Sequence, residues 1–239
     1  MKGCVGAIDG RIIKTRRPSL TENRRARAFW CFRKNCYGVN LQATCDADGK
    51  NLDADVSNTA KDSDSISHRV SDLGVDIRND EMPEGWYLVG DAAYVQGKHM
   101  MTPVPGLAAN MGVWADSYNF QQSSIRMNIE RALGMLIRRW GILWRPLEFH
   151  HDKWAPVIMC VMRLHNLCMD HHVGLSEGLA TDGCVRRRGA MVQSRPRIDR
   201  DGRPVDFLTD DRHRYAPDDE LMRNHIIEAV KDAGITRPA

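Results

Sequence analysis

The chain has 239 residues, a mass of 27.1 kDa and a formal net charge of +3, with an isoelectric point near 8.5. Hydrophobic residues make up 42% and charged residues 27%, and no run approaches the roughly 20 apolar residues that a membrane span needs. This composition excludes a membrane-spanning protein, and the net charge is too small to establish a nucleic-acid partner on its own.

The cysteines and the first residues indicate the compartment. The seven cysteines show no repeating framework, which predicts reduced thiols in an intracellular protein. The opening run is too short and too interrupted by glycine for a signal-peptide core. Neither Cys31 with Cys36, nor His165 with Cys168 and His171, has the paired four-ligand spacing of a zinc site.

Extended patterns open the chain. Residues 4–9 form a short apolar run that ends at Asp9, and residues 37–45 alternate apolar with polar or small residues. Turn-forming residues at 46–50 then predict a hairpin that returns along residues 51–57. We therefore expect three antiparallel strands in the first 60 residues.

A helix and a fourth strand are expected next. Asp62 is a candidate helix cap, and three apolar residues follow it at i, i+4 and i+7: Ile66, Val70 and Leu73. Residues 86–90 form another apolar run, which ends at Asp91. A strand reached through a helical crossover usually lies parallel to an earlier strand, so Asp9 and Asp91 are predicted at neighbouring strand ends.

Irregular chain is expected at 97–119, and two long helices after it. Residues 125–140 have helical spacing, with Glu130 on the shoulder of an apolar stripe formed by Ile125, Ile129, Leu133, Leu136 and Trp140. Residues 154–169 predict a buried helix with Asp152 as its cap and Pro156 in its first turn. Residues 173–239 form a polar tail, expected to be disordered at 181–214 and helical near 219–233.

Three acids stand where local apolar patterns end or turn aside: Asp9, Asp91 and Glu130. If they converge at about 4 Å, each pair repels by roughly 4 kcal/mol at an effective dielectric constant of about 20. Such a cluster implies bound cations, and hard divalent ions with oxygen ligands, Mg²⁺ or Mn²⁺, suit it best. Basic residues close to these acids in sequence favour a polyanionic substrate, with a solvated basic surface as the alternative.

Several local motifs occur in one order along residues 3–172. They include Gly6-Ala7-Ile8-Asp9-Gly10, Leu88-Val89-Gly90-Asp91-Ala92-Ala93-Tyr94, the stretch around Arg126-Met127-Asn128-Ile129-Glu130, and Leu164-His165-Asn166. In these motifs the chain resembles the PIF/Harbinger transposases and their DDE superfamily endonuclease relatives. The resemblance implies an α/β fold with a ribonuclease H-like mixed sheet flanked by helices.

The same resemblance assigns roles to individual residues. It implies that Asp9, Asp91 and Glu130 form a catalytic triad that holds two divalent metal ions for DNA strand cleavage and joining. Asp62 lies where the family has a His-Asp-Ser sequence, and Arg126 precedes Glu130 by one helical turn, so both are accessory candidates. A helix cap explains Asp62 equally well, and Arg126 could contact DNA phosphate or orient Glu130.

Two departures from the family pattern lie beside the predicted site. Arg11-Ile12 follows Asp9-Gly10 where the family has threonine and histidine, and Lys61 replaces the histidine before Asp62. Only eight residues precede Asp9, so we expect a catalytic core without the upstream DNA-binding segment of the family.

The expected organisation is a nuclease core over residues 1–172 and a polar tail over residues 173–239. The expected function is a metal-dependent DNA endonuclease or transposase in the nucleus, with DNA and a separate DNA-binding protein as partners. The alternatives are a catalytically inactive, transposase-derived nuclear factor that binds DNA or protein, and a product of a truncated gene model.

Overall fold

The computed structural model describes residues 1–106, 112–173 and 217–238, and the predicted disordered segment 181–214 lies outside these ranges. Within them the protein is a mixed α/β structure with a six-stranded sheet and five α-helices. The sheet contains β1 (Cys4–Lys14), β2 (Trp30–Cys31), β3 (Cys36–Cys45), β4 (Asn51–Thr59), β5 (Tyr87–Val89) and β6 (Met100–Met101). This architecture confirms the ribonuclease H-like α/β fold class.

Strand pairing follows the order β2-β3-β1-β5-β6, and β4 also pairs with β3. The β1–β3 and β3–β4 pairs are antiparallel, as the sequence predicts, whereas β5 lies parallel to β1 and β6 lies parallel to β5. The helical crossover after β4 is long enough to bring β5 back beside β1 in the parallel direction.

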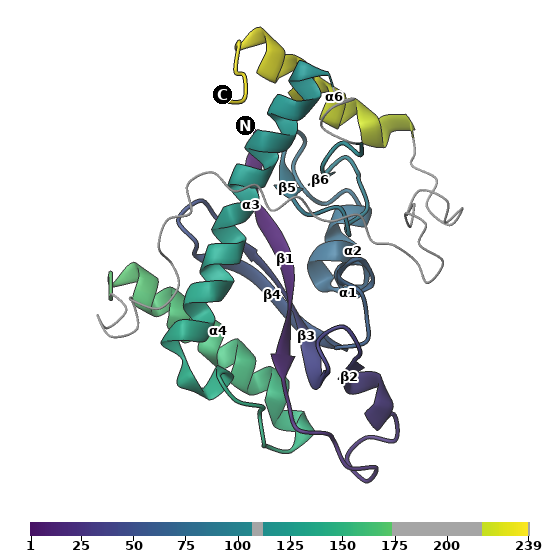
Figure 1. The fold of residues 1–239 in the computed structure, drawn as a ribbon, viewed down its shortest axis with the longest axis vertical. Helices are drawn as coiled ribbons and strands as arrows, with labels where there is room; N and C mark the ends of the chain where they lie inside the picture. Colours follow the sequence, from purple (N-terminus) through teal and green to yellow (C-terminus); the bar gives the residue numbers. More distant parts are fainter. Residues whose placement is uncertain (107–111, 174–216, 239) are drawn as a thin grey trace.

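Helices cover both faces of the sheet. The helices α3 (Val113–Arg139) and α4 (Trp154–Asp170) lie on one face, and α1 (Asp64–Val70) and α2 (Asp72–Arg78) lie on the other (Figure 1). The α3 stripe is a core element, because Ile129, Leu133 and Leu136 are buried and Ile125 and Trp140 pack beside them. This confirms the apolar stripe predicted for residues 125–140.

The helix α6 (Pro217–Asp232) corresponds to the helix expected near residues 219–233. It lies beside the N-terminal half of α3 (Figure 1), and its Ile226 and Val230 are buried. Ile226 shares an apolar cluster with Tyr87 of β5 and Tyr118 of α3. This helix is therefore part of the packed structure.

Several predicted boundaries are wrong. Asp9 is not at a strand end, because antiparallel pairing with β3 extends β1 five residues beyond it, to Lys14. The region 97–119, expected to be irregular, contains β6 and the first turns of α3. Proline and glycine in that region interrupt the sequence pattern without preventing a two-residue strand or a later helix start.

The cap predictions are also corrected. The crossover contains two short helices capped by Ser63 and Ser71, and Asp62 is not the cap. Ile66 and Val70 are exposed, so their spacing does not mark a buried stripe. The N-cap of α4 is Lys153, whose side chain makes no capping bond, rather than Asp152.

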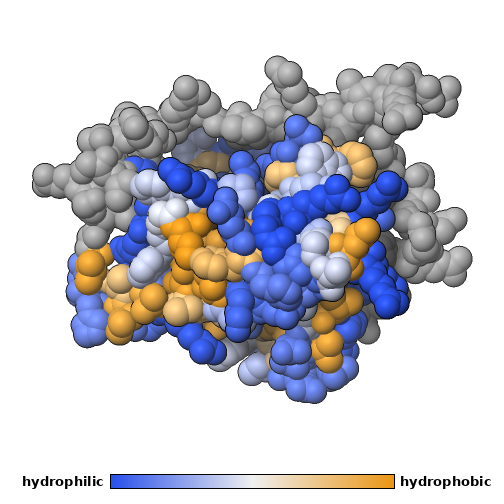
Figure 2. Space-filling model, turned by 90° about the horizontal axis from the view of Figure 1, so that it is seen from below, coloured by the Kyte–Doolittle hydropathy of each residue, from blue (hydrophilic) through white to orange (hydrophobic). Residues whose placement is uncertain are grey.

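The α4 helix buries only one face. Trp154, Ile158 and Met162 lie in the core, whereas Leu164 and Leu167 are 39% and 52% exposed, so the prediction of a buried helix is half correct. The view from below in Figure 2 shows hydrophobic residues gathered between hydrophilic ones.

No helix in the described ranges is both long and apolar enough to cross a membrane.

Candidate active site

The alternation of β1 determines which face Asp9 occupies. Ala7 packs into the core cluster that contains α3, whereas Ile8 packs with Leu73 and Ile77 on the opposite face. Because side chains alternate along a strand, Asp9 shares the α3 face with Ala7. The acid therefore interrupts the apolar face of a central strand, where it is only partly exposed.

Parallel pairing with β5 brings a second acid to the same level. Ala7 pairs with Val89, and Asp9 and Asp91 each lie two residues further along. The Ala93 N–H donates a 2.8 Å hydrogen bond to Asp91 Oδ1 and fixes this carboxylate at the start of the loop after β5. The fold therefore juxtaposes two of the three predicted acids.

Charge and burial both act on Asp9. Its pKa is raised from 3.8 to about 6, first by burial and then by the negative charges of Asp91 and Asp64. The Gly10 N–H, which donates a 2.9 Å bond to Asp9 Oδ1, and the Arg126 charge oppose this rise. Burial and two neighbouring negative charges therefore outweigh the Gly10 hydrogen bond and the Arg126 charge at this carboxylate.

Asp64 is an acid that the sequence reasoning missed. It is the first residue of α1, and its Oδ1 accepts 3.1 Å bonds from the side-chain amides of Asn40 and Gln42 on β3. A β-carbon on Gly10 would fall on the Asp64 carboxylate, so this acid lies directly against the backbone beside Asp9. The pattern Ser63-Asp64 resembles an ordinary helix start, and only the sheet reveals its neighbours.

A buried network of side-chain hydrogen bonds stabilises the position of Asp64. The Tyr94 hydroxyl donates a 2.7 Å bond to Gln42 Oε1, and Gln42 in turn donates to Asp64 and to Asn40 Oδ1. Burial raises the pKa of Tyr94 well above 10, with a further contribution from the Asp64 charge, so its hydroxyl stays a donor. Of these side chains, only Asn40 and Gln42 donate to the Asp64 carboxylate directly, and Tyr94 acts through Gln42.

Glu130 takes a different position. It is exposed on α3, and its Oε1 accepts a 2.7 Å ion pair from Arg126, one turn earlier. Gln122, one further turn back, donates to the Gly90 carbonyl and anchors α3 beside Asp91. Glu130 lies roughly 12 Å along the helix from this anchor, since each residue advances the helix by about 1.5 Å.

The three predicted acids are not assembled as a ligand set. Among the described residues, the one group of three histidine, cysteine or acidic side chains with ligand atoms within 4.8 Å of one another is Glu22, His150 and His151. Asp9, Asp91 and Glu130 do not meet this criterion. Arg126 contributes its charge at Asp9 and its hydrogen bond at Glu130, so it lies between the acid pair and the third acid.

Asp62 points elsewhere. Its Oδ2 accepts bonds from the Thr59 N–H at 3.0 Å and the Thr59 hydroxyl at 2.7 Å, and it closes the turn between β4 and α1. It also lines a surface hollow with Arg25 and Lys61. The accessory role predicted for Asp62 therefore has no contact with the acid pair to support it.

The family model of the DDE superfamily endonucleases matches residues 8–166, which is more than half of the chain. The chain belongs to the DDE superfamily endonucleases. The match begins one residue before Asp9 and ends after α1, β5 and α3, so it spans the acids described above. No curated protein and no solved structure matches the chain.

Because the chain belongs to a DDE endonuclease family, the ligand atoms that Asp9 and Asp91 offer can be compared with those that divalent metal ions prefer. Asp9 and Asp91 offer carboxylate oxygens, the donors that Mg²⁺ and Mn²⁺ prefer. Burial and the negative charge of Asp91 raise the pKa of Asp9 more than the positive charge of Arg126 lowers it. These two residues therefore fit a divalent cation, while Glu130 would have to share its carboxylate with Arg126.

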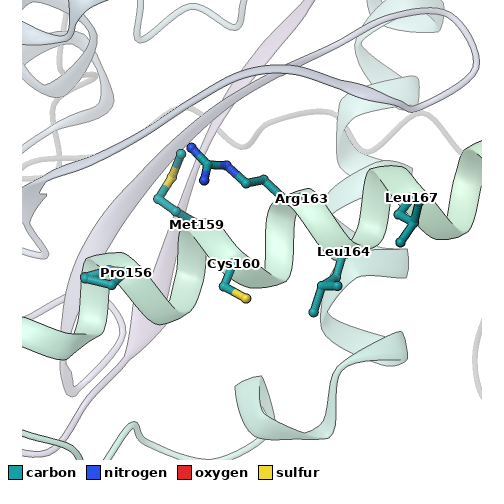
Figure 3. A pocket seen from close by; sticks show the side chains of 6 residues that line it. All are labelled: Pro156, Met159, Cys160, Arg163, Leu164 and Leu167. Atoms are coloured by element: carbon teal, nitrogen blue, oxygen red, sulfur yellow. The ribbon is translucent and has the colours of Figure 1, made fainter.

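A second surface feature of this DDE endonuclease is a hollow along the exposed face of α4, with a volume of about 640 Å³. Figure 3 shows the six side chains that line it: Pro156, Met159, Cys160, Arg163, Leu164 and Leu167. Its lining is mainly apolar and contains no acid. It lies on another element from the acid pair and has no chemistry for phosphodiester cleavage.

The Leu164-His165-Asn166 motif connects α4 to the sheet and is not near the acid pair in sequence. Asn166 donates a 2.7 Å bond to the Asn51 carbonyl and accepts one of 2.9 Å from the Asn51 N–H, which pairs α4 with the start of β4. His165 is fully buried, and burial lowers its pKa to about 4. Both residues lie on α4, remote in sequence from the acid-bearing strands.

Proposed function

We propose that the protein is the core of a divalent-metal-dependent DNA endonuclease of PIF/Harbinger type. The observation that carries this proposal is the juxtaposition of Asp9 and Asp91 on parallel neighbouring strands, with the pKa of Asp9 raised to about 6. Membership in an endonuclease family gives DNA as the substrate class. Nuclear localisation and a separate DNA-binding partner belong to the same proposal.

The residues near the acid pair would have different roles in this reaction. Asp9 and Asp91 would hold Mg²⁺ or Mn²⁺, with Glu130 completing the set when one of its oxygens is free of Arg126. Ions held there would supply Lewis-acid chemistry: a more acidic bound water as nucleophile and a positive charge beside the leaving 3′ oxygen. The Gly10 and Ala93 N–H groups fix the two aspartates, and Arg126 supplies a positive charge for the scissile phosphate.

Asp64 would act as a positioning residue in this proposal. Its carboxylate accepts hydrogen bonds from Asn40 and Gln42 and packs directly against the backbone of Gly10. This contact would fix the position of the neighbouring Asp9. Its charge also helps to keep the pKa of Asp9 high until a cation binds. Substitution of Asp64 should therefore change metal affinity more than the turnover of the metal-saturated protein.

Cleavage of supercoiled plasmid by the full chain tests the proposal. We expect nicking with Mg²⁺ or Mn²⁺ and none with EDTA, and we expect Asp91→Asn to abolish it. Asp48 offers a matched control, since Asp48→Asn changes an exposed carboxylate in the turn between β3 and β4. Circular dichroism of each variant separates loss of activity from loss of folding.

One outcome would contradict this function and favour the second candidate. A folded protein that neither cuts DNA nor shows Mg²⁺ or Mn²⁺ binding by calorimetry would be a non-catalytic binding factor derived from a transposase. The ion pair between Arg126 and Glu130 favours this second reading, because it neutralises the charge of the third acid and holds it one helical turn from Arg126. Glu130→Gln distinguishes the two, since only a nuclease should lose an activity.

A further inference from the structure

A second ligand cluster lies beyond the end of β1. Glu22 belongs to the loop after β1, and His150 and His151 precede α4. Each offers one ligand atom, and these atoms all lie within 4.8 Å of one another. Arg16, the partner of Glu22, lies seven positions after Asp9 along nearly extended chain. At about 3.3 Å per residue, the cluster therefore lies roughly 20 Å from the acid pair.

Backbone pairing holds the two segments together. The Arg16 N–H donates to the Leu147 carbonyl at 3.0 Å, and the Leu147 N–H donates to the Lys14 carbonyl at 2.9 Å. Arg16 Nε also donates to the Glu148 carbonyl at 3.0 Å, while its guanidinium pairs with both carboxylate oxygens of Glu22. The cluster is therefore built on fixed backbone.

The distances suit a tetrahedral metal centre. His150 Nε2 lies 3.5 Å from Glu22 Oε1, and in a zinc site with bonds of about 2.0 to 2.1 Å neighbouring ligand atoms are about 3.4 Å apart. The Glu22 side chain is only 8% exposed, so its carboxylate is well held. Each carboxylate oxygen has two lone pairs, so pairing with Arg16 leaves acceptor capacity for a cation.

Asp152 occupies the position of an orienting carboxylate. Its Oδ2 lies 3.3 Å from His150 Nδ1, and its Oδ1 lies 3.0 Å from His151 Nδ1. His150 Nδ1 also accepts a long 3.5 Å bond from the Asp152 N–H, and metal binding through Nε2 would replace it by donation from Nδ1 to Oδ2. The buried Nδ1 of His151 has no hydrogen bond of good geometry within the described part of the chain. Metal-binding histidines characteristically direct their second nitrogen at such a carboxylate, which fixes the tautomer and the ring orientation.

We propose that Glu22, His150 and His151 bind a transition-metal ion of the zinc class, and that Asp152 orients the two imidazoles. Two imidazoles and one carboxylate favour Zn²⁺, Co²⁺ or Ni²⁺ over Mg²⁺, which takes oxygen ligands and water. The ion would clamp the loop after β1 to the start of α4. This site is separate from the proposed nuclease centre and does not depend on it.

Titration of the full chain with Co²⁺, followed by visible absorption, tests the proposal. We expect d–d bands of a low-coordinate nitrogen and oxygen site, without the near-ultraviolet charge transfer that cysteine thiolates give. Equimolar Zn²⁺ should remove these bands. The double variant His150→Asn/His151→Asn should lose them, and asparagine keeps a capping acceptor at position 150.

Two further variants sharpen the result. Asp152→Asn should weaken Co²⁺ affinity by about 10- to 100-fold while leaving the bands in place. His171→Asn/His172→Asn is the matched control, because both histidines are exposed at the end of α4, and it should leave binding unchanged. Absence of the bands, or bands that persist in the His150/His151 variant, would overturn the proposal.

Discussion

At the scale of single residues, Asp9 lowers the stability of the fold. Its pKa is raised to about 6 in the folded protein, whereas an ordinary aspartate titrates near 3.8. Between these pH values the folded state binds more protons than the unfolded state, so the free energy of unfolding falls as pH rises through this window. This pH dependence would agree with the metal-binding role proposed for Asp9.

Asp9→Asn should therefore stabilise the metal-free protein by about 1 to 3 kcal/mol at pH 7, since each unit of pKa shift corresponds to about 1.4 kcal/mol. Urea unfolding at pH 7 and at pH 4 measures this, and the gain should shrink at the lower pH. Asp48→Asn, at an exposed turn, should leave stability nearly unchanged. Equal stability of wild type and Asp9→Asn at pH 7 would contradict the prediction.

Gly10 has a steric role beside Asp9. A β-carbon there would collide with the Asp64 carboxylate and approach Gln42 Nε2 within 2.5 Å. Gly10→Ala should therefore destabilise the fold by about 1 to 3 kcal/mol, as overpacking does. Gly134→Ala is the matched control, because Gly134 lies in α3 with open space around its β-carbon position. Thermal unfolding should show a gain for that control, since alanine favours a helix by about 0.5 to 1 kcal/mol.

At the scale of elements, the contact of α3 with the end of β5 positions the acids. The buried Gln122 side chain donates to the Gly90 carbonyl, which immediately precedes Asp91. Arg126 and Glu130 follow on the same helix face, four and eight residues after Gln122. The hydrogen bond of Gln122 to Gly90 therefore fixes where these two residues lie relative to the end of β5.

Gln122→Ala should cost about 1 to 3 kcal/mol of stability, because it leaves a buried carbonyl without its donor. It should also lower metal-dependent nicking, since α3 loses its anchor beside Asp91. Gln121→Ala changes the neighbouring residue, which is only partly buried, and should be nearly neutral. A Gln122→Ala protein with wild-type stability in urea would show that the bond does not hold the helix.

At the scale of the whole molecule, two buried histidines change the free energy of unfolding with pH in the opposite direction to Asp9. Burial lowers the pKa of both His68 and His165 from 6.5 to about 4, with smaller contributions from Arg78 and Arg139. Their neutral forms are favoured in the fold, so the stability they contribute is complete above pH 6.5 and is lost as pH falls toward 4.

The free energy of unfolding should therefore fall between pH 6.5 and pH 4, because two histidines outweigh two aspartates of opposite sign, Asp9 and Asp53. We expect a net loss of about 1 to 3 kcal/mol, measured by urea unfolding across this range. Asp9→Asn should steepen the loss, since it removes one of the opposing groups. A flat profile in the wild-type protein would contradict the assignment of neutral, buried histidines.

The sequence alone determined the elements whose patterns are local. Alternation predicted β3, apolar spacing predicted the core stripe of α3, and the parallel placement of β5 beside β1 followed from the crossover rule. The motifs around Asp9 and Asp91 indicated the DDE superfamily endonucleases, which the match over residues 8–166 confirms, while the PIF/Harbinger subtype stays a prediction. These features depend on residues close in the chain, so the sequence could predict them.

Only the tertiary structure decided the neighbours of each side chain. Pairing with β3 extended β1 beyond Asp9, and packing of α1 against the sheet brought Asp64 against Gly10. The cluster of Glu22, His150 and His151 joins residues more than 120 positions apart, and no local spacing signals it. Contacts of this kind arise from strand register and helix packing, which depend on the whole chain, so the sequence pattern could not reveal them.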